Sequence, residues 1–212
     1  MALTRHAIPA GRPYAALGLL LLAVAGGCTT LAPIEPSPQV YTGRFVASIS
    51  RDEQREAVSG RFTLAASAGR TTLDLASPLG NTLARVEANA NRAMLTAPQA
   101  DGTLATWRGD SPEALAESVL GYRLPVAGLA DWIAGRAAPG RPAQVFPEAG
   151  PTQRIEQDGW VITIDERFED SGAPRRLSVD RTAGVSSGPS VRLRLVLDAA
   201  GGGAGAPNWS RP

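Results

Sequence analysis

The chain has 212 residues and carries 21 basic against 20 acidic side chains, a formal net charge of +1 at pH 7. Nucleic-acid binding needs a concentrated basic surface, so this nearly neutral balance argues against a nucleic-acid partner. The length is sufficient for one domain with a sizeable hydrophobic core.

The first 27 residues have the parts of a secretory signal peptide. Basic residues precede an apolar run over residues 15–25, which is too short to span a bilayer comfortably. Small residues then lead into Cys28, the only cysteine of the chain. This pattern resembles the lipobox cut by lipoprotein signal peptidase, although Ala25 stands where leucine is commoner. We predict that residues 1–27 are removed and that Cys28 is lipidated; the alternative is an ordinary signal peptide with an incidental cysteine.

Lipidation explains a cysteine that has no partner for an internal disulfide. Several acyl chains on one residue make a durable anchor, whereas a single chain binds a membrane only marginally. Thr29, and no aspartate, follows Cys28, and by similarity to lipoproteins of enteric-type bacteria this points to the outer membrane. Prolines in residues 28–40 predict an extended tether, and the folded domain is expected over residues 41–198.

Alternating apolar residues predict many half-buried strands in this domain. The clearest pattern covers residues 191–197, where valine and leucine alternate with Arg192 and Arg194. Short gaps between the strands predict antiparallel neighbours. Further strands are expected around residues 45–49, 62–64, 73–75, 83–88, 92–96, 104–107, 160–164 and 177–179.

Two helices are expected between the two groups of strands. Ser111 can cap the first helix and Gly121 can end it. The second begins at Pro125 and ends at Gly135, although Gly128 inside it costs about 1 kcal/mol relative to alanine.

The region after these helices is expected to be a loop with Pro139, Pro142 and Pro147, followed by the last strands. The glycine-rich residues 199–212 are expected to be a disordered tail. Together the elements predict an α+β fold, in which a curved antiparallel sheet or partial barrel is partly closed by its helices.

Catalytic chemistry is restricted because the only histidine, His6, leaves with the signal peptide. Without histidine or a free cysteine, Ser–His–Asp catalysis, cysteine nucleophiles and histidine-bearing zinc sites are excluded. We therefore expect no catalytic residue, no metal and no cofactor. One alternative is a hydrolase using two carboxylates from the cluster Asp165, Glu166, Glu169 and Asp170, although charges beside a hairpin turn are usually solvated.

An apolar residue occupies the third position of a predicted turn at residues 77–80. Serine, proline and glycine at positions one, two and four favour a type I turn, which places Leu79 near its tip. Leu79 could fold back onto a neighbouring strand, or it could form an exposed apolar tip for a membrane or another apolar partner. The turn by itself favours the first of these, in which Leu79 folds back.

The motifs taken together resemble the family of the outer-membrane lipoprotein receptor LolB. They are the lipobox, YTGRF at residues 41–45, PLG at 78–80, LGYRLPVAGLADWIAG at 120–135 and QDGW at 157–160, where a strand starts. Their order matches the family over most of the mature chain, and the glycine-rich tail departs from it.

This resemblance implies an incomplete antiparallel β-barrel whose helices form a lid over an apolar cavity. It implies a receptor, anchored in the outer membrane and facing the periplasm, that accepts lipoproteins from the soluble carrier LolA and places them in the inner leaflet of that membrane. Pro78, Leu79 and Gly80 correspond to a projecting loop that aids delivery, and we expect a monomer. Acyl chains are expected to contact a set of apolar residues, each of which could equally be ordinary core: Phe45, Phe62, Leu64, Leu73, Leu75, Trp107, Leu115, Val119, Leu129, Trp132 and Ile133.

A competing interpretation is a structural outer-membrane lipoprotein that scaffolds an envelope assembly and has no acyl cavity. The receptor interpretation has a physical reason of its own. An acyl chain of ~16 carbons costs on the order of 12 kcal/mol to leave in water, so it needs a protein cavity to cross the periplasm.

Overall fold

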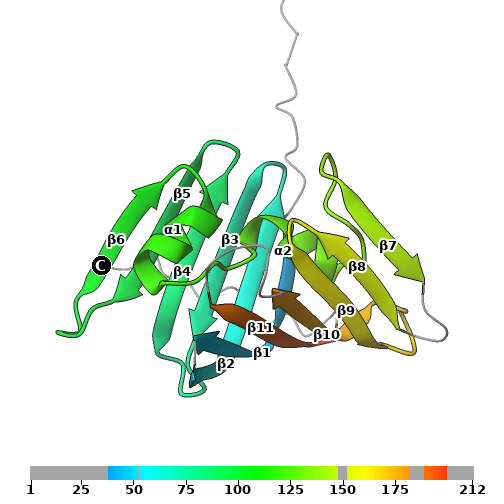
Figure 1. The fold of residues 1–212 in the computed structure, drawn as a ribbon, viewed down its shortest axis with the longest axis horizontal. Helices are drawn as coiled ribbons and strands as arrows, with labels where there is room; N and C mark the ends of the chain where they lie inside the picture. Colours follow the sequence, from blue (N-terminus) through cyan, green and yellow to red (C-terminus); the bar gives the residue numbers. More distant parts are fainter. Residues whose placement is uncertain (1–37, 52, 148–151, 182–188, 200–212) are drawn as a thin grey trace, which may run out of the picture. The chain divides into compact units, whose positions relative to one another are not determined.

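The computed structural model describes residues 38–51, 53–147, 152–181 and 189–199. The predicted signal peptide, Cys28, the tether up to residue 37 and the tail from residue 200 lie outside the described residues. The described residues form one eleven-stranded sheet and two helices (Figure 1). In chain order the elements are β1 Gln39–Arg51, β2 Gln54–Ser67, β3 Arg70–Ala76, β4 Thr82–Asn89, β5 Arg92–Pro98, β6 Leu104–Gly109, α1 Pro112–Leu120, α2 Val126–Ile133, β7 Ala143–Pro147, β8 Gln153–Gln157, β9 Trp160–Arg167, β10 Pro174–Arg181 and β11 Ser190–Leu197.

The sheet is an antiparallel meander in which the first and last strands meet. Its order is β6-β5-β4-β3-β2-β1-β11-β10-β9-β8-β7, so β1 and β11 pair at the centre. The edges are β6 and β7, and within the described residues they do not pair with each other. The sheet is therefore open, which is consistent with the predicted incomplete barrel.

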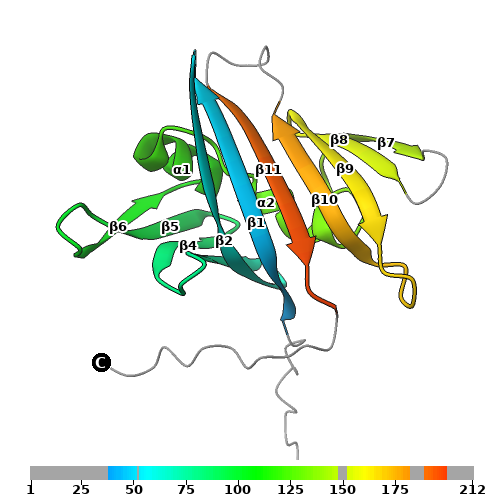
Figure 2. The ribbon, with the colours of Figure 1, turned by 90° about the horizontal axis from the view of Figure 1, so that it is seen from below.

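Both helices lie on one face of the sheet, in the connection that carries the chain from the β6 edge to the β7 edge (Figure 2). Helix α1 packs on β4, β5 and β6, while α2 packs on β2 and β3. Figure 2, which looks from below, places β1 and β11 in front and both helices behind the sheet. Neither helix of the described part is long and apolar enough to cross a membrane.

The predicted helix signals are confirmed. The hydroxyl of Ser111 accepts a hydrogen bond from the backbone N–H of Ala114 at 3.2 Å, and Gly121 ends α1 with φ +78°. Helix α2 begins at Val126, one residue after Pro125. The predicted alternation is also confirmed: Val191, Leu193, Leu195 and Leu197 are buried in β11, while both intervening arginines are exposed.

The prediction of a loop between the helices and the last strands is wrong, because β7 and β8 lie there. Proline is tolerated at both ends of β7 because β7 is an edge strand. Val145 and Phe146 are both partly exposed, so β7 has no alternating pattern, and in β8 the only buried apolar residue is Ile155. Asp158 and Gly159, with φ of +54° and +76°, form the two-residue turn to Trp160 at the start of β9.

Candidate functional site

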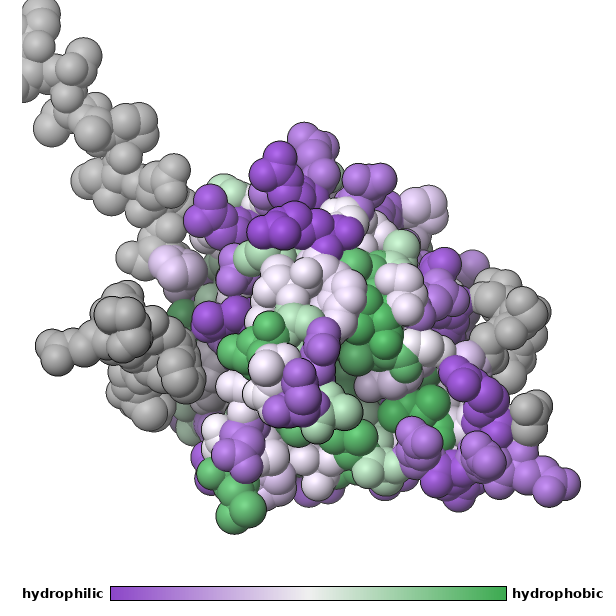
Figure 3. Space-filling view, turned by 90° about the vertical axis from the view of Figure 1, so that its left-hand side faces the viewer, coloured by the Kyte–Doolittle hydropathy of each residue, from purple (hydrophilic) through white to green (hydrophobic). Residues whose placement is uncertain are grey.

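An apolar pocket of about 230 Å³ lies between the helix-bearing face of the sheet and the segment that leads into α2. Figure 3, seen from the β6 side, shows apolar side chains running down the middle of this side of the molecule and hydrophilic ones towards its rim. The lining contains only apolar side chains and one tyrosine: Phe45, Ala47, Val58, Phe62, Leu73, Leu75, Leu83, Ala84, Leu193 and Leu195 from the sheet, and Leu120, Tyr122, Leu124, Pro125, Val126 and Leu129 from the helical segment.

Part of the predicted set of acyl-contacting residues lies at this pocket. Phe45, Phe62, Leu73, Leu75 and Leu129 line it. The others do not line it and belong to, or pack against, the solid core: Leu64, Leu115, Trp132 and Ile133 are buried, and Trp107 and Val119 are partly buried.

Two copies of the tripeptide Gly-Arg-Phe build one wall of the pocket. In the antiparallel register of β1 and β2, Gly43 lies opposite Phe62 and Phe45 lies opposite Gly60. A Cβ atom added to Gly43 would lie 2.8 Å from Cε1 of Phe62, and one added to Gly60 would lie 3.0 Å from Cε1 of Phe45. Each ring therefore covers the glycine on the neighbouring strand. The repeat of this tripeptide is the sequence signal that could have predicted this wall.

The turn that carries Leu79 starts and ends at the pocket wall, because Leu75 and Leu83 on either side of it both line the pocket. The Gly80 N–H donates to the Ser77 carbonyl at 2.9 Å, and Gly80 has φ +89°. Leu79 is 90% exposed. The alternative in which Leu79 folds back onto a strand is therefore wrong, and the turn presents an apolar tip.

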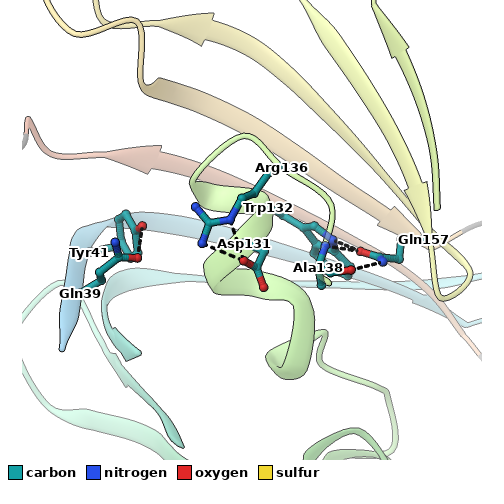
Figure 4. Close-up of polar contacts among 7 residues, drawn as sticks. All are labelled: Gln39, Tyr41, Asp131, Trp132, Arg136, Ala138 and Gln157. Carbon is teal, nitrogen blue, oxygen red and sulfur yellow. Dashed lines mark hydrogen bonds and ion pairs between the residues drawn. The ribbon is translucent and has the colours of Figure 1, made fainter. Parts of the chain in front are cut away.

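A buried glutamine ties the end of α2 to β8 (Figure 4). Gln157 is 3% exposed, and its Oε1 accepts from the indole N–H of Trp132 and from the Ala138 N–H, both at 2.8 Å. Its Nε2 donates to the carbonyls of Ala138 at 2.9 Å and Arg141 at 3.3 Å. Every polar atom of this side chain is therefore bonded, as burial requires.

Gly128 makes room for the indole of Trp132. A Cβ added at Gly128 would lie 2.6 Å from Cε2 of Trp132. The indole therefore lies against the helix surface at the position of the glycine. Gly128 lowers the helix propensity of α2, and the close approach of the Trp132 indole explains why glycine stands there.

A second contact holds the start of the segment between the helices. The Arg51 side chain, at the end of β1, donates to the Gly121 carbonyl at 3.0 Å.

The tyrosine in the pocket lining, Tyr122, is partly buried. Burial, followed by the nearby negative charge of Glu56, raises the pKa of Tyr122. The phenol of Tyr122 therefore stays uncharged at neutral pH, which suits an apolar pocket.

The acidic cluster lies away from the pocket. Asp165 and Glu166 belong to β9, and Glu166 pairs with Arg176 at 3.4 Å. Partial burial raises the pKa of Asp165, and the charges of Arg176 and Arg194 oppose that rise. In the described part of the chain no three His, Cys, Asp or Glu side chains are grouped to hold a metal ion.

Comparison with known proteins gives one family. A family model described as Outer membrane lipoprotein LolB matches residues 42–199. The protein named Outer-membrane lipoprotein LolB from Cupriavidus metallidurans is 34% identical over 200 residues, which cover 86% of this chain and 95% of that protein. Proteins of the same name from Cupriavidus necator and Bordetella petrii are each 38% identical, covering 86% and 84% of this chain and 92% and 88% of their own lengths.

Proposed function

The chain belongs to the LolB family of outer-membrane lipoproteins, and we propose that it is a receptor in lipoprotein localisation. In this proposal it faces the periplasm, is held on the outer membrane by lipid on Cys28, and accepts lipoproteins from the carrier LolA. It then places their acyl chains in the inner leaflet. The observation that carries the proposal is an apolar pocket with an exposed leucine turn attached to its wall.

The pocket supports a role in binding acyl chains through its chemistry. Its lining offers apolar contacts, with one uncharged phenol, and so suits hydrocarbon. Its volume of about 230 Å³ is below the ~300–1,000 Å³ of typical ligand sites. We propose that the pocket widens when α2 and residues 120–125 move away from the sheet, so that they act as a lid.

The exposed turn supports a role in release. Leu79 lies beyond the pocket residues Leu75 and Leu83, so a membrane that receives Leu79 is close to the pocket. Burial of one leucine side chain contributes about 2 kcal/mol. This is enough to hold the pocket at the membrane briefly and too little to trap the protein there.

Transfer in this proposal needs no enzyme activity and no cofactor. The carrier, the receptor and the bilayer each hold the acyl chains, and each step shifts an equilibrium towards the site that binds them better. Only differences in binding free energy drive the cargo forward.

The proposed tether is long enough for the lipid on Cys28 and the Leu79 turn to contact the same membrane. Gln39 pairs with Ala66, which pairs with Thr71, so β1 starts about five residues, or ~17 Å, from the Leu79 end of β3. The eleven steps from Cys28 to Gln39 (39 − 28) reach at most ~36–40 Å, which exceeds that separation. We propose residues 1–27 as signal peptide, 28–40 as lipidated tether, 41–198 as the receptor domain and 199–212 as a tail, in a monomer.

Depletion of the protein in living cells tests the proposal. We expect newly made lipoproteins to accumulate in complex with the periplasmic carrier, and expression of the wild-type chain should release them. If the carrier stays empty and an envelope protein complex falls apart instead, the scaffolding interpretation replaces the receptor. The depleted cells also serve as the background for the variants described below.

A further inference from the structure

Two turns at the same end of the sheet have the same backbone geometry. In the turn at residues 77–81 the Ser77 N–H donates to the Asn81 carbonyl at 2.8 Å, and the Gly80 N–H donates to the Ser77 carbonyl at 2.9 Å. In the turn at residues 99–103 the Gln99 N–H donates to the Thr103 carbonyl at 2.8 Å, and the Gly102 N–H donates to the Gln99 carbonyl at 2.9 Å. The fourth residue is glycine in each, with φ +89° at Gly80 and +83° at Gly102.

The equivalent third positions carry opposite chemistry. Leu79 occupies this position in the β3–β4 turn, and Asp101 occupies it in the β5–β6 turn. The N–H and hydroxyl of Thr103 donate to the Asp101 carboxylate at 2.9 and 2.6 Å. The hydroxyl bond, then the backbone bond, lower the pKa of Asp101, so its charge is retained at neutral and mildly acidic pH.

The two tips reach nearly the same level along the strands. Arg85 pairs with Thr96, which brings the Pro98 end of β5 level with Leu83, one residue from the start of β4. Two strand spacings, on the order of 10 Å, separate the turns across the sheet. Both turns lie at the lower end of the sheet in Figure 1. A flat membrane that meets one tip therefore meets the other.

We propose that Asp101 is a charged stop that limits how deeply the Leu79 turn enters the membrane. Leaving a carboxylate unpaired in hydrocarbon is strongly unfavourable, whereas burying a leucine is favourable. Leu79 therefore enters the apolar layer only as far as Asp101 can remain among the hydrated headgroups. Leu104, directly after the second turn, is 64% exposed, so this hairpin end carries an apolar side chain next to the acid.

This inference rests on the proposed membrane contact of Leu79, and depth measurement tests the two separately. The full lipidated protein is reconstituted in vesicles of phosphatidylethanolamine and phosphatidylglycerol, with Asn81→Cys carrying an environment-sensitive fluorophore. Cys28 is the only native cysteine, so in the lipidated protein the new thiol is the only free one. Brominated lipids, with bromine near the headgroup or in mid-chain, report the depth of the fluorophore.

We expect Asp101→Asn, which preserves acceptance from the Thr103 N–H, to shift quenching towards mid-chain bromine by about twofold or more, because charge no longer opposes burial. Asp101→Leu should shift it further. Asp110→Asn, a matched loss of charge at the other end of β6, should change nothing. Unchanged depth in both Asp101 variants, with the wild-type turn inserted, would overturn the stop alone. A fluorophore unquenched in every protein would overturn the stop and the Leu79 contact together.

Discussion

The indole N–H of Trp132 donates to Oε1 of Gln157 at 2.8 Å, and this bond joins the last turn of α2 to β8. Gln157→Ala removes it together with the bonds to Ala138 and Arg141. Because buried donors and acceptors lose their partners, we expect a loss of about 2–4 kcal/mol in the free energy of unfolding. Urea unfolding measures it. Gln144→Ala, on the exposed part of β7, is the control, and equal midpoints for the two variants would contradict the expectation.

Gly128→Ala should reverse the usual sign of a glycine-to-alanine change in a helix. Helix propensity favours alanine by about 1 kcal/mol, but the new Cβ would collide with the Trp132 indole. Displacement of the indole also strains its bond to Gln157. We expect net destabilisation in thermal unfolding, with a changed tryptophan fluorescence spectrum. Ala127→Gly, at an exposed position of the same helix, gives the ordinary propensity cost for comparison; a more stable Gly128→Ala protein would refute the packing argument.

Leu79→Glu should slow insertion of lipoproteins into the outer membrane and leave acceptance of cargo unchanged. Loss of about 2 kcal/mol of leucine burial corresponds to roughly 30-fold weaker membrane contact. The rate is followed by transfer of a labelled lipoprotein from the carrier to membranes. Val145→Glu places the same charge at a 49% exposed apolar residue on the edge strand β7, away from the Leu79 turn, and should transfer normally. Wild-type rates for Leu79→Glu would remove the membrane role of the turn.

Ala84→Leu tests whether the pocket takes acyl chains. Ala84 is 5% exposed and lines the pocket, so the larger side chain should occupy part of its volume and weaken binding of a fluorescent fatty acid. Because the pocket has free volume, the larger side chain should fit with little loss in the free energy of unfolding. Ala116→Leu, on the buried face of α1, should cost about 1–3 kcal/mol of unfolding free energy. Unchanged fatty-acid binding by Ala84→Leu would place the chains elsewhere.

Asp165→Asn should stabilise the protein at pH 7. Partial burial raises the pKa of Asp165 above its ordinary value of 3.8, so the folded state binds the proton more tightly than the unfolded state. Stability is therefore lost as the pH rises from the ordinary pKa through the raised one, and it stays reduced above that range. The asparagine carries no such charge, so its unfolding midpoint should exceed that of the wild type at pH 7 and match it below the ordinary pKa. Glu169→Gln, in the exposed turn after β9, is the control; a lower midpoint for Asp165→Asn at pH 7 would contradict the argument.

Local patterns were enough for most of the secondary structure and for the apolar turn. Alternation predicted the central strands, and Ser111 and Gly121 predicted the limits of α1. These signals are readable because each depends on residues a few positions apart. Strand β7 was not predicted, because an edge strand can lack apolar–polar alternation and can contain proline.

The exposure of Leu79 and the lining of the pocket depended on the tertiary structure. Phe62 and Leu64 stand two residues apart on the same face of β2, yet Phe62 lines the pocket and Leu64 fills the solid core. Periodicity identifies the buried face of a strand, but it carries no information about what covers that face. The covering segment around Leu129 is some 65 residues further along the chain (129 − 64 = 65), and Gln157 holds its far end. The sequence by itself determined the antiparallel strands, the limits of α1 and the position of the leucine turn, because these depend on neighbouring residues. Long-range packing determined which apolar residues line the pocket.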